Sequence, residues 1–157
     1  MQCRVLTEAD VPVVYELCRQ NPLYYHHCPP FVTEEYIRED MKALPPGKTL
    51  EDKFYLGWFE EDRLVAVMDL IRAFPDAETW FIGFFMMAAN AQGKGVGSRI
   101  ISELCTELAD RGVKHIRLGW VQGNPQAEHF WLKNAFVRTG VTSKTENYTI
   151  ILAQREL

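Results

Sequence analysis

Phe84-Phe-Met-Met-Ala-Ala-Asn-Ala-Gln-Gly-Lys-Gly-Val-Gly-Ser-Arg-Ile100 is the stretch of sequence that decides the fold. An apolar run leads into a glycine-rich turn, and the turn leads directly into a segment with apolar residues at helical spacing, positions 96, 100, 101, 104, 105 and 108. Gly93, Gly95 and Gly97 have no side chains, so backbone N–H groups can converge beside the positive end of the helix dipole. The stretch therefore predicts a strand, a phosphate-binding turn and a helix.

Two common phosphate-binding patterns do not fit this turn. A P-loop needs Gly-Lys followed by Ser or Thr, and here Lys94 is followed by Gly95. A dinucleotide fingerprint needs a glycine three positions after Gly95, where Ser98 stands, and this turn lies in mid-chain after an antiparallel meander. A glycine-rich turn without any ligand is the plainer alternative.

The rest of the chain alternates strands and helices around this turn. Thr7 and Pro12 predict a helix over Glu8–Arg19, and Thr33 predicts a second over Glu34–Leu44. Strands are predicted over 4–6, 54–59, 64–72, 79–87, 115–121, 137–142 and 148–153, and further helices from 96 to 112 and over 125–134. The central strand, helix and strand imply a parallel crossover between antiparallel hairpins, hence a mixed α/β sheet in a single domain over 1–157.

The composition limits the class of partner. The 157 residues are 47% hydrophobic and 24% charged with a net charge of −4, as in an ordinary globular domain. A nucleic-acid binder would show a basic excess, so we expect no nucleic-acid partner. The longest apolar run, Trp80–Ala89, is shorter than the ~20 residues of a membrane span, and the N-terminus lacks a signal-peptide pattern. We therefore expect a cytoplasmic protein with no membrane partner.

Two motifs resemble those of the GCN5-related N-acetyltransferases, the acyl-CoA-dependent GNAT family. Gln92–Gly97 looks like the family signature Gln/Arg-x-x-Gly-x-Gly/Ala, and Asn124–Phe136 looks like its second motif, Asn-x-x-Ala-x-x-Phe-Tyr-x-Lys-x-Gly-Phe. The preceding strand, Phe81–Met87, stands where the family's fourth strand ends in a bulge. The resemblance implies a GNAT-like α/β fold of the α+β type, with a mixed, mostly antiparallel sheet, a central parallel strand pair and helices on both faces.

The resemblance also implies acetyl-CoA as co-substrate, with no metal. The pyrophosphate would lie on the backbone of the turn, at Gln92, Gly93, Lys94, Gly95, Val96 and Gly97, with Ser98 adjacent. The pantetheine arm would pair with the backbone around Phe85 and Met87, and the N–H at or near Met87 would stabilise the thioester oxyanion. Asn124 would lie beside the pantetheine, although it fits equally well as the N-cap of the following helix.

The group that protonates the departing thiolate is an open question. The family often has a Tyr for this role where this chain has Trp131, near the thiol end of the cofactor, and an indole has no useful acidic proton. Tyr148 or water could serve instead. A thiol with a pKa near about 8.5 can also leave as the thiolate with modest help.

The acceptor amine needs a base to remove its proton. Asp69 interrupts the apolar strand 64–72, where a carboxylate is unusual. Its side chain would face either the central cleft or the solvent side of a hairpin. Glu78, at the start of a strand, is a second candidate and fits equally well as a surface charge.

The segment Leu23–Phe31 is dense in aromatic residues and is predicted as a loop between two helices. By the resemblance it would line the acceptor site, with Tyr24, Tyr25, His26 and Phe31 as candidate wall residues. Alternatively, its aromatic side chains fold the loop back on the core. The His-His-Cys run does not predict a metal site, because adjacent residues seldom converge on one ion and the cysteines lack metal-ligand spacing.

These motifs predict an N-acetyltransferase that moves an acetyl group from acetyl-CoA to a primary amine of a small molecule or peptide. Attack would be direct, within a ternary complex. The Trp at position 131 keeps a second interpretation open, an acyl-CoA-binding sensor with little turnover. A phosphate-ligand protein unrelated to CoA is a third. By resemblance, the terminal strands could form a homodimer.

Overall fold

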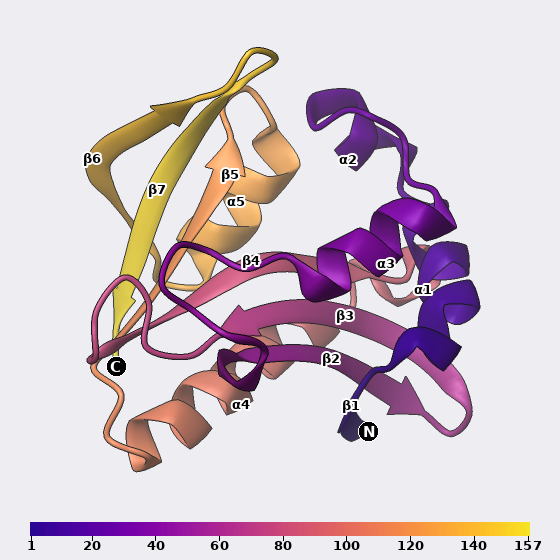
Figure 1. The fold of residues 1–157 in the computed structure, drawn as a ribbon, viewed down its shortest axis with the longest axis horizontal. Helices are drawn as coiled ribbons and strands as arrows, with labels where there is room; N and C mark the ends of the chain where they lie inside the picture. The colour runs from indigo at the N-terminus through magenta and orange to yellow at the C-terminus, as the bar shows by residue number, and fades with distance from the viewer.

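One seven-stranded sheet runs through the computed structural model, which describes all 157 residues, in the order β1-β2-β3-β4-β5-β7-β6 (Figure 1). The strands are β1 (Gln2–Val5), β2 (Lys53–Glu60), β3 (Arg63–Ile71), β4 (Thr79–Met87), β5 (His115–Val121), β6 (Val137–Lys144) and β7 (Thr149–Glu156). All neighbours pair antiparallel except β4 and β5, which pair parallel. The predicted mixed, mostly antiparallel sheet with one central parallel pair is confirmed.

Helices cover both faces of this sheet, as predicted. They are α1 (Val11–Cys18), α2 (Pro22–His27), α3 (Glu34–Lys42), α4 (Val96–Asp110) and α5 (Pro125–Lys133), with 3₁₀ turns at Glu8–Asp10, Leu50–Asp52 and Ala89–Ala91. The apolar residues of α4 and α5 pack into one core, and those of α1, α2 and α3 pack into a second core on the opposite face. Figure 1 shows α3 in front of the sheet and α4 behind it. No helix combines the length and the apolar character needed to cross a membrane.

The segment after Asn21 corrects one prediction. The loop expected over Leu23–Phe31 is wrong for its first half, because α2 runs from Pro22 to His27. Proline ends the preceding helix, but its fixed φ also suits the first position of a new helix. The first predicted helix, Glu8–Arg19, also differs from the structure. Thr7 and Asp10 form a capping box around a 3₁₀ turn, and the α-helix begins only at Val11.

A bulge at Gly83 bends the central strand β4. The register with β3 shifts at this point, so Gly83 is the extra residue on the β4 side. The parallel pairing of β4 with β5 ends immediately before it, at the pair Ile82–Leu118. The bulge therefore separates β4 from β5 toward their C-terminal ends.

Replacing Leu108 by Ala tests the packing of α4 on the sheet. Leu108 is only 2% exposed, so its loss should lower the free energy of unfolding by about 2–5 kcal/mol. The matched change Leu50→Ala, at a side chain 61% exposed, should change it by less than about 0.5 kcal/mol. Urea denaturation measures both, and equal effects would contradict the assigned core.

Candidate active site

The divergence of β4 and β5 opens a cleft of about 570 Å³. Residues 82–87 and 118–121, from the two diverging strands, form its floor. The glycine turn and α5 close one end, which we call the loop end. Residues from α2, α3 and the start of β7 close the other, which we call the α3 end. In Figure 1 the tip of the β6–β7 hairpin and α2 stand at the same end of the molecule.

Two backbone N–H groups of β4 face this cleft without a strand partner. The N–H of Ala88 donates to the carbonyl of Val65 at 2.8 Å, so the backbone groups of Ala88 face β3. Backbone direction alternates along a strand, so the N–H groups of Phe85 and Met87 face the β5 side. The β5 ladder has already ended there. The cleft floor therefore offers two donors that a bound chain can use.

The glycine turn forms an open cradle at the start of α4. Gly93 and Gly95 have φ of +74° and +78°, a left-handed conformation that side chains other than glycine adopt at a cost. A Cβ on either residue would meet no atom within 4 Å, so the space above both is free. The free N–H groups of the 15-residue helix α4 point to the same place. The cradle fits a phosphate group in size, polarity and charge.

The remaining turn residues contribute in different ways. The side chain of Lys94 is exposed and that of Val96 packs against the core, so neither lines the cleft and only their backbone is available. A Cβ on Gly97 would lie 3.1 Å from the ring of Phe130, so glycine here lets α4 approach α5 closely. The Ser98 hydroxyl accepts a hydrogen bond from Asn134 at 3.2 Å and lines the cleft.

A hydrogen-bond network ties the turn to the junction of α1 and α2. The Met87 carbonyl accepts from Asn21 Nδ2 at 3.1 Å and from Gln92 Nε2 at 3.2 Å. Gln92 Nε2 also donates to Asn21 Oδ1 at 2.7 Å. From the sequence, Asn21 is predicted only to end a helix. Its partner Met87 lies 66 residues away along the chain, so no local pattern indicates the contact.

Helix α5 brings Asn124 and Trp131 to the cleft. Asn124 is buried, caps α5 by accepting from the Ala127 N–H at 3.3 Å, and lines the cleft, so its capping and its position beside a ligand are compatible. The buried Trp131 ring lies 5.9 Å from Phe85 and 4.9 Å from Phe130, centroid to centroid. These rings form an apolar wall below the open side of β4.

The α3 end is lined by tyrosines around one thiol and one carboxylate. Tyr24 packs edge-on against Phe84, with centroids 5.7 Å apart. Tyr36 and Asp40 lie one turn apart on α3, so both face the cleft. Burial and the nearby Asp40 raise the pKa of Tyr36 to about 12. Neither Tyr36 nor Asp40 was predicted from the sequence, because only the packing of α3 on the sheet brings them here.

Tyr148 enters the same end from the β6–β7 hairpin. It lines the cleft beside Cys28. The neighbouring Cys28 thiol, together with partial burial, raises the pKa of Tyr148 to about 12. The phenol is therefore protonated at neutral pH.

Asp69 lies beneath the cleft floor and not on a solvent face. It is 7% exposed, and its Oδ2 lies 3.1 Å from Lys53 Nζ. A Cβ on Gly83 would lie 2.8 Å from Asp69 Oδ2, so the bulge glycine alone separates the carboxylate from the cleft. Burial raises the pKa of Asp69 to about 6, although Lys53 opposes the shift.

The other predicted site residues lie outside the cleft. Glu78 is exposed at the far end of β4, where its carbonyl accepts from the backbone of Lys114 and His115. Of the four predicted wall residues, only Tyr24 lines the cleft. The side chains of the others are placed elsewhere: Tyr25 is buried in the α1–α3 core, and His26 and Phe31 are exposed.

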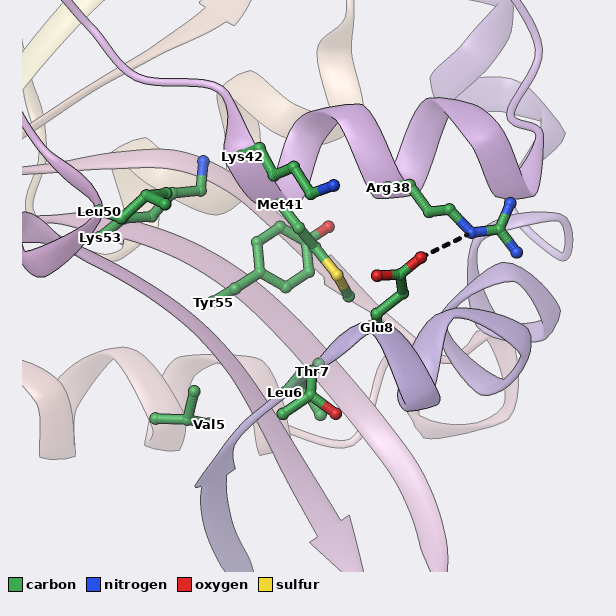
Figure 2. A pocket seen from close by; sticks show the side chains of 10 residues that line it. All are labelled: Val5, Leu6, Thr7, Glu8, Arg38, Met41, Lys42, Leu50, Lys53 and Tyr55. Carbon is green, nitrogen blue, oxygen red and sulfur yellow. Dashed lines mark ion pairs between the residues drawn. The ribbon is translucent and has the colours of Figure 1, made fainter.

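A second, smaller pocket of about 240 Å³ is lined in part by Tyr55 (Figure 2). Glu8 and Arg38 form an ion pair of 3.6 Å there, and Lys53 directs its Nζ to the carbonyl of Ala43 and to Asp69. Neither pocket contains a group of three or more His, Cys, Asp or Glu side chains that could hold a metal ion. The larger cleft, with its open cradle and free donors, is therefore the candidate active site.

The chain belongs to the Acetyltransferase (GNAT) family, whose model matches residues 14–136. We found no match among curated protein sequences.

Solved structures share the whole fold at low sequence identity. An acetyltransferase from Thermus thermophilus is 20% identical with a TM-score of 0.80, over 99% of this chain and 96% of that one. The PaiA N-acetyltransferase from Thermoplasma acidophilum, in complex with coenzyme A, is 18% identical with a TM-score of 0.68, over 99% and 98%. The ribosomal-protein-alanine N-acetyltransferase from Brucella melitensis is 18% identical with a TM-score of 0.69, over 100% of both chains.

Replacing Gly95 by Ala tests whether the cradle holds the CoA pyrophosphate. The added methyl group enters the free space where the phosphates would lie, so the Kd for CoA should rise at least about tenfold. Gly112→Ala is a matched control at the other end of α4, because Gly112 also has positive φ and open space. Both variants should lose about 1–2 kcal/mol of stability. Calorimetry showing equal CoA affinity for the two variants would contradict the assignment.

Proposed function

We propose that this protein is an N-acetyltransferase that moves the acetyl group of acetyl-CoA to a primary amine of a small molecule or peptide. Attack is direct, within a ternary complex. The observation that carries the proposal is the open edge of β4, where the N–H groups of Phe85 and Met87 adjoin the free cradle of the glycine turn. A ligand with a pyrophosphate at one end and an amide-bearing arm matches this combination.

The residues at the loop end bind and orient the CoA ester in this proposal. Backbone N–H groups from Gly93 to Ser98 hold the pyrophosphate, because the Gln92 N–H already donates to the Ala89 carbonyl at 3.4 Å. Met87, the open residue of β4 nearer to the turn, pairs with the pantetheine amides as an added strand would. The Phe85 N–H, which is the open donor nearer to Gly83 and Asp69, faces the thioester carbonyl and stabilises its developing negative charge. Asn124 and Trp131 form the wall against which the arm lies.

Asp69 is the proposed base. The amine nitrogen attacks the thioester carbonyl carbon, the carbon–sulfur bond breaks, and the proton of the amine passes to Asp69 over Gly83, directly or through a water. A carboxylate with a pKa of about 6 holds a proton better than an ordinary one and is still ionised at neutral pH. Position favours Asp69 over Glu78, which is exposed at the other end of β4.

Tyr148 is proposed to assist the leaving sulfur as a hydrogen-bond donor. Its pKa of about 12 keeps the phenol protonated, but that pKa also exceeds the ~8.5 of a thiol, so full proton transfer to the thiolate would be uphill. The thiolate can leave with this hydrogen bond alone. The Tyr that the family often places at position 131 is then not required.

A CoA sensor with little turnover is the second candidate function. The observation that favours it is Trp131, which cannot act as an acid. For either function we propose a cytoplasmic location with no nucleic-acid or membrane partner. A homodimer through the terminal strands stays a prediction, for which the exposed edge strand β6 is available.

Release of CoA thiol from acetyl-CoA, measured with a panel of primary amines and short peptides, tests the proposed activity. We expect amine-dependent release together with a product heavier by one acetyl group in mass spectrometry. Binding of acetyl-CoA without turnover of any amine would favour the sensor. Failure to bind acetyl-CoA at millimolar concentration would contradict both functions.

The pH dependence of kcat tests Asp69. The base acts in its ionised form, so kcat should fall as the pH drops below about 6, where Asp69 becomes protonated. Asp69→Asn should lower kcat at neutral pH by about 10²–10⁴-fold and remove this limb. Asp62→Asn, at an exposed position in the β2–β3 turn, is the matched control. It should keep the wild-type kcat at neutral pH and the fall of kcat below about pH 6. An unchanged profile in a folded Asp69→Asn protein would contradict the role.

A further inference from the structure

The α3 end of the cleft has the composition of a cation subsite. Asp40 is the only carboxylate among the residues that line the cleft, and the cationic Lys133 lies at the opposite, loop end. The rings of Tyr24, Tyr36 and Tyr148 line the space beside Asp40. Aromatic faces and a carboxylate together attract a positively charged nitrogen.

The tyrosines add no negative charge of their own. Burial raises the pKa of Tyr24, and the pKa values of Tyr36 and Tyr148 are each raised to about 12. All three phenols are therefore neutral at physiological pH and act as hydrogen-bonding walls. Asp40 is left as the group at this end that can pair with a cation.

A buried cluster behind Asp40 carries one uncompensated negative charge. The Lys53 side chain is 3% exposed and its Nζ lies 3.1 Å from Asp69 Oδ2. Burial raises the pKa of Asp40, and the positive charge of Lys53 opposes this shift. Tyr55 donates to Asp40 Oδ2 at 3.4 Å, and its ring centroid lies 5.9 Å from Lys53 Nζ. Two carboxylates thus share one ammonium group. Burial of an unpaired charge is costly, so the cluster favours a cation entering from the cleft.

A second observation points the same way. Asp69 Oδ1 is buried and has no hydrogen-bond partner, although a buried carboxylate oxygen normally has one. A Cβ on Gly83 would meet the Oδ2, Cγ and Cβ atoms of Asp69 first, and Gly83, which has no side chain, lines the cleft. A protonated amine placed over Gly83 would approach Asp69, and a second positive nitrogen on the same molecule could lie against Asp40.

We propose that the acceptor is a compact aliphatic diamine or polyamine. One amine reacts over Gly83 and gives its proton to Asp69. A second nitrogen stays protonated and pairs with Asp40 among the three tyrosine rings. This inference rests on the proposed acetyltransferase function. It selects acceptors with two positive charges over monoamines and over peptide N-termini, which present one.

The kinetic preference for a second charge tests the subsite. Diaminobutane and pentylamine have nearly the same shape, but the diamine has an ammonium group where the monoamine has a methyl group. We expect kcat/KM for diaminobutane to exceed that for pentylamine by at least about tenfold, mainly through KM. The pairs diaminopropane with butylamine, and diaminopentane with hexylamine, extend the comparison to other lengths.

Asp40→Asn tests the anchoring residue. Asparagine keeps an oxygen that can accept from Tyr55 but removes the negative charge. In this variant, kcat/KM for diaminobutane should therefore lie within about threefold of kcat/KM for pentylamine. Glu39→Gln, at an exposed neighbour on the same helix, should keep the full preference. Retained CoA affinity in calorimetry shows that the Asp40→Asn protein is folded.

The outcomes separate this inference from the proposed function. Equal turnover of diamine and monoamine by the wild-type protein, or faster turnover of a peptide N-terminus, would overturn the inference and leave the acetyltransferase function in place. A full diamine preference in folded Asp40→Asn would overturn it as well. Absence of turnover with every amine and peptide would contradict the proposed function itself.

Discussion

The early end of the β4–β5 ladder is the constraint on which the rest of the structure depends. Parallel pairing stops at Ile82–Leu118, and the next residue of β4 is the bulge glycine, Gly83. If the ladder continued, β5 would occupy the N–H groups of Phe85 and Met87, and the central cleft would be filled. The sheet thus gives up several backbone hydrogen bonds at its centre, and the proposed co-substrate would supply them in part.

Gly83 and Met87 connect the two ends of the cleft through a single strand. Gly83 opens the floor toward Asp69 at the α3 end, and the Met87 carbonyl joins Asn21 and Gln92 at the loop end. A shift of β4 would therefore move the proposed base, the proposed oxyanion donor and the glycine turn together. This shared support explains how residues from distant parts of the chain can act on one reacting centre.

Local patterns predicted most of the fold and the loop end of the site. The bounds of β4 and β5 follow from apolar runs bounded by turn residues, and the glycine turn is visible because its chemistry is contiguous. Asp40 and Asn21 could not be found in this way, because they reach the cleft only when their helices pack on the sheet. Tyr25 was predicted to line the acceptor site for a related reason. Its neighbour Tyr24 faces the cleft, whereas the side chain of Tyr25 faces the core.

Amide hydrogen exchange at Phe85 and Met87 tests the central claim most directly, because it observes the two donors themselves. Both amides lack a strand partner, so they should exchange rapidly in the free protein and at least about tenfold more slowly with saturating CoA. Amides on the exposed edge strand β6 should keep their rates. Unchanged exchange at Phe85 and Met87 when CoA is bound would contradict the proposal that this open edge of β4 holds the co-substrate.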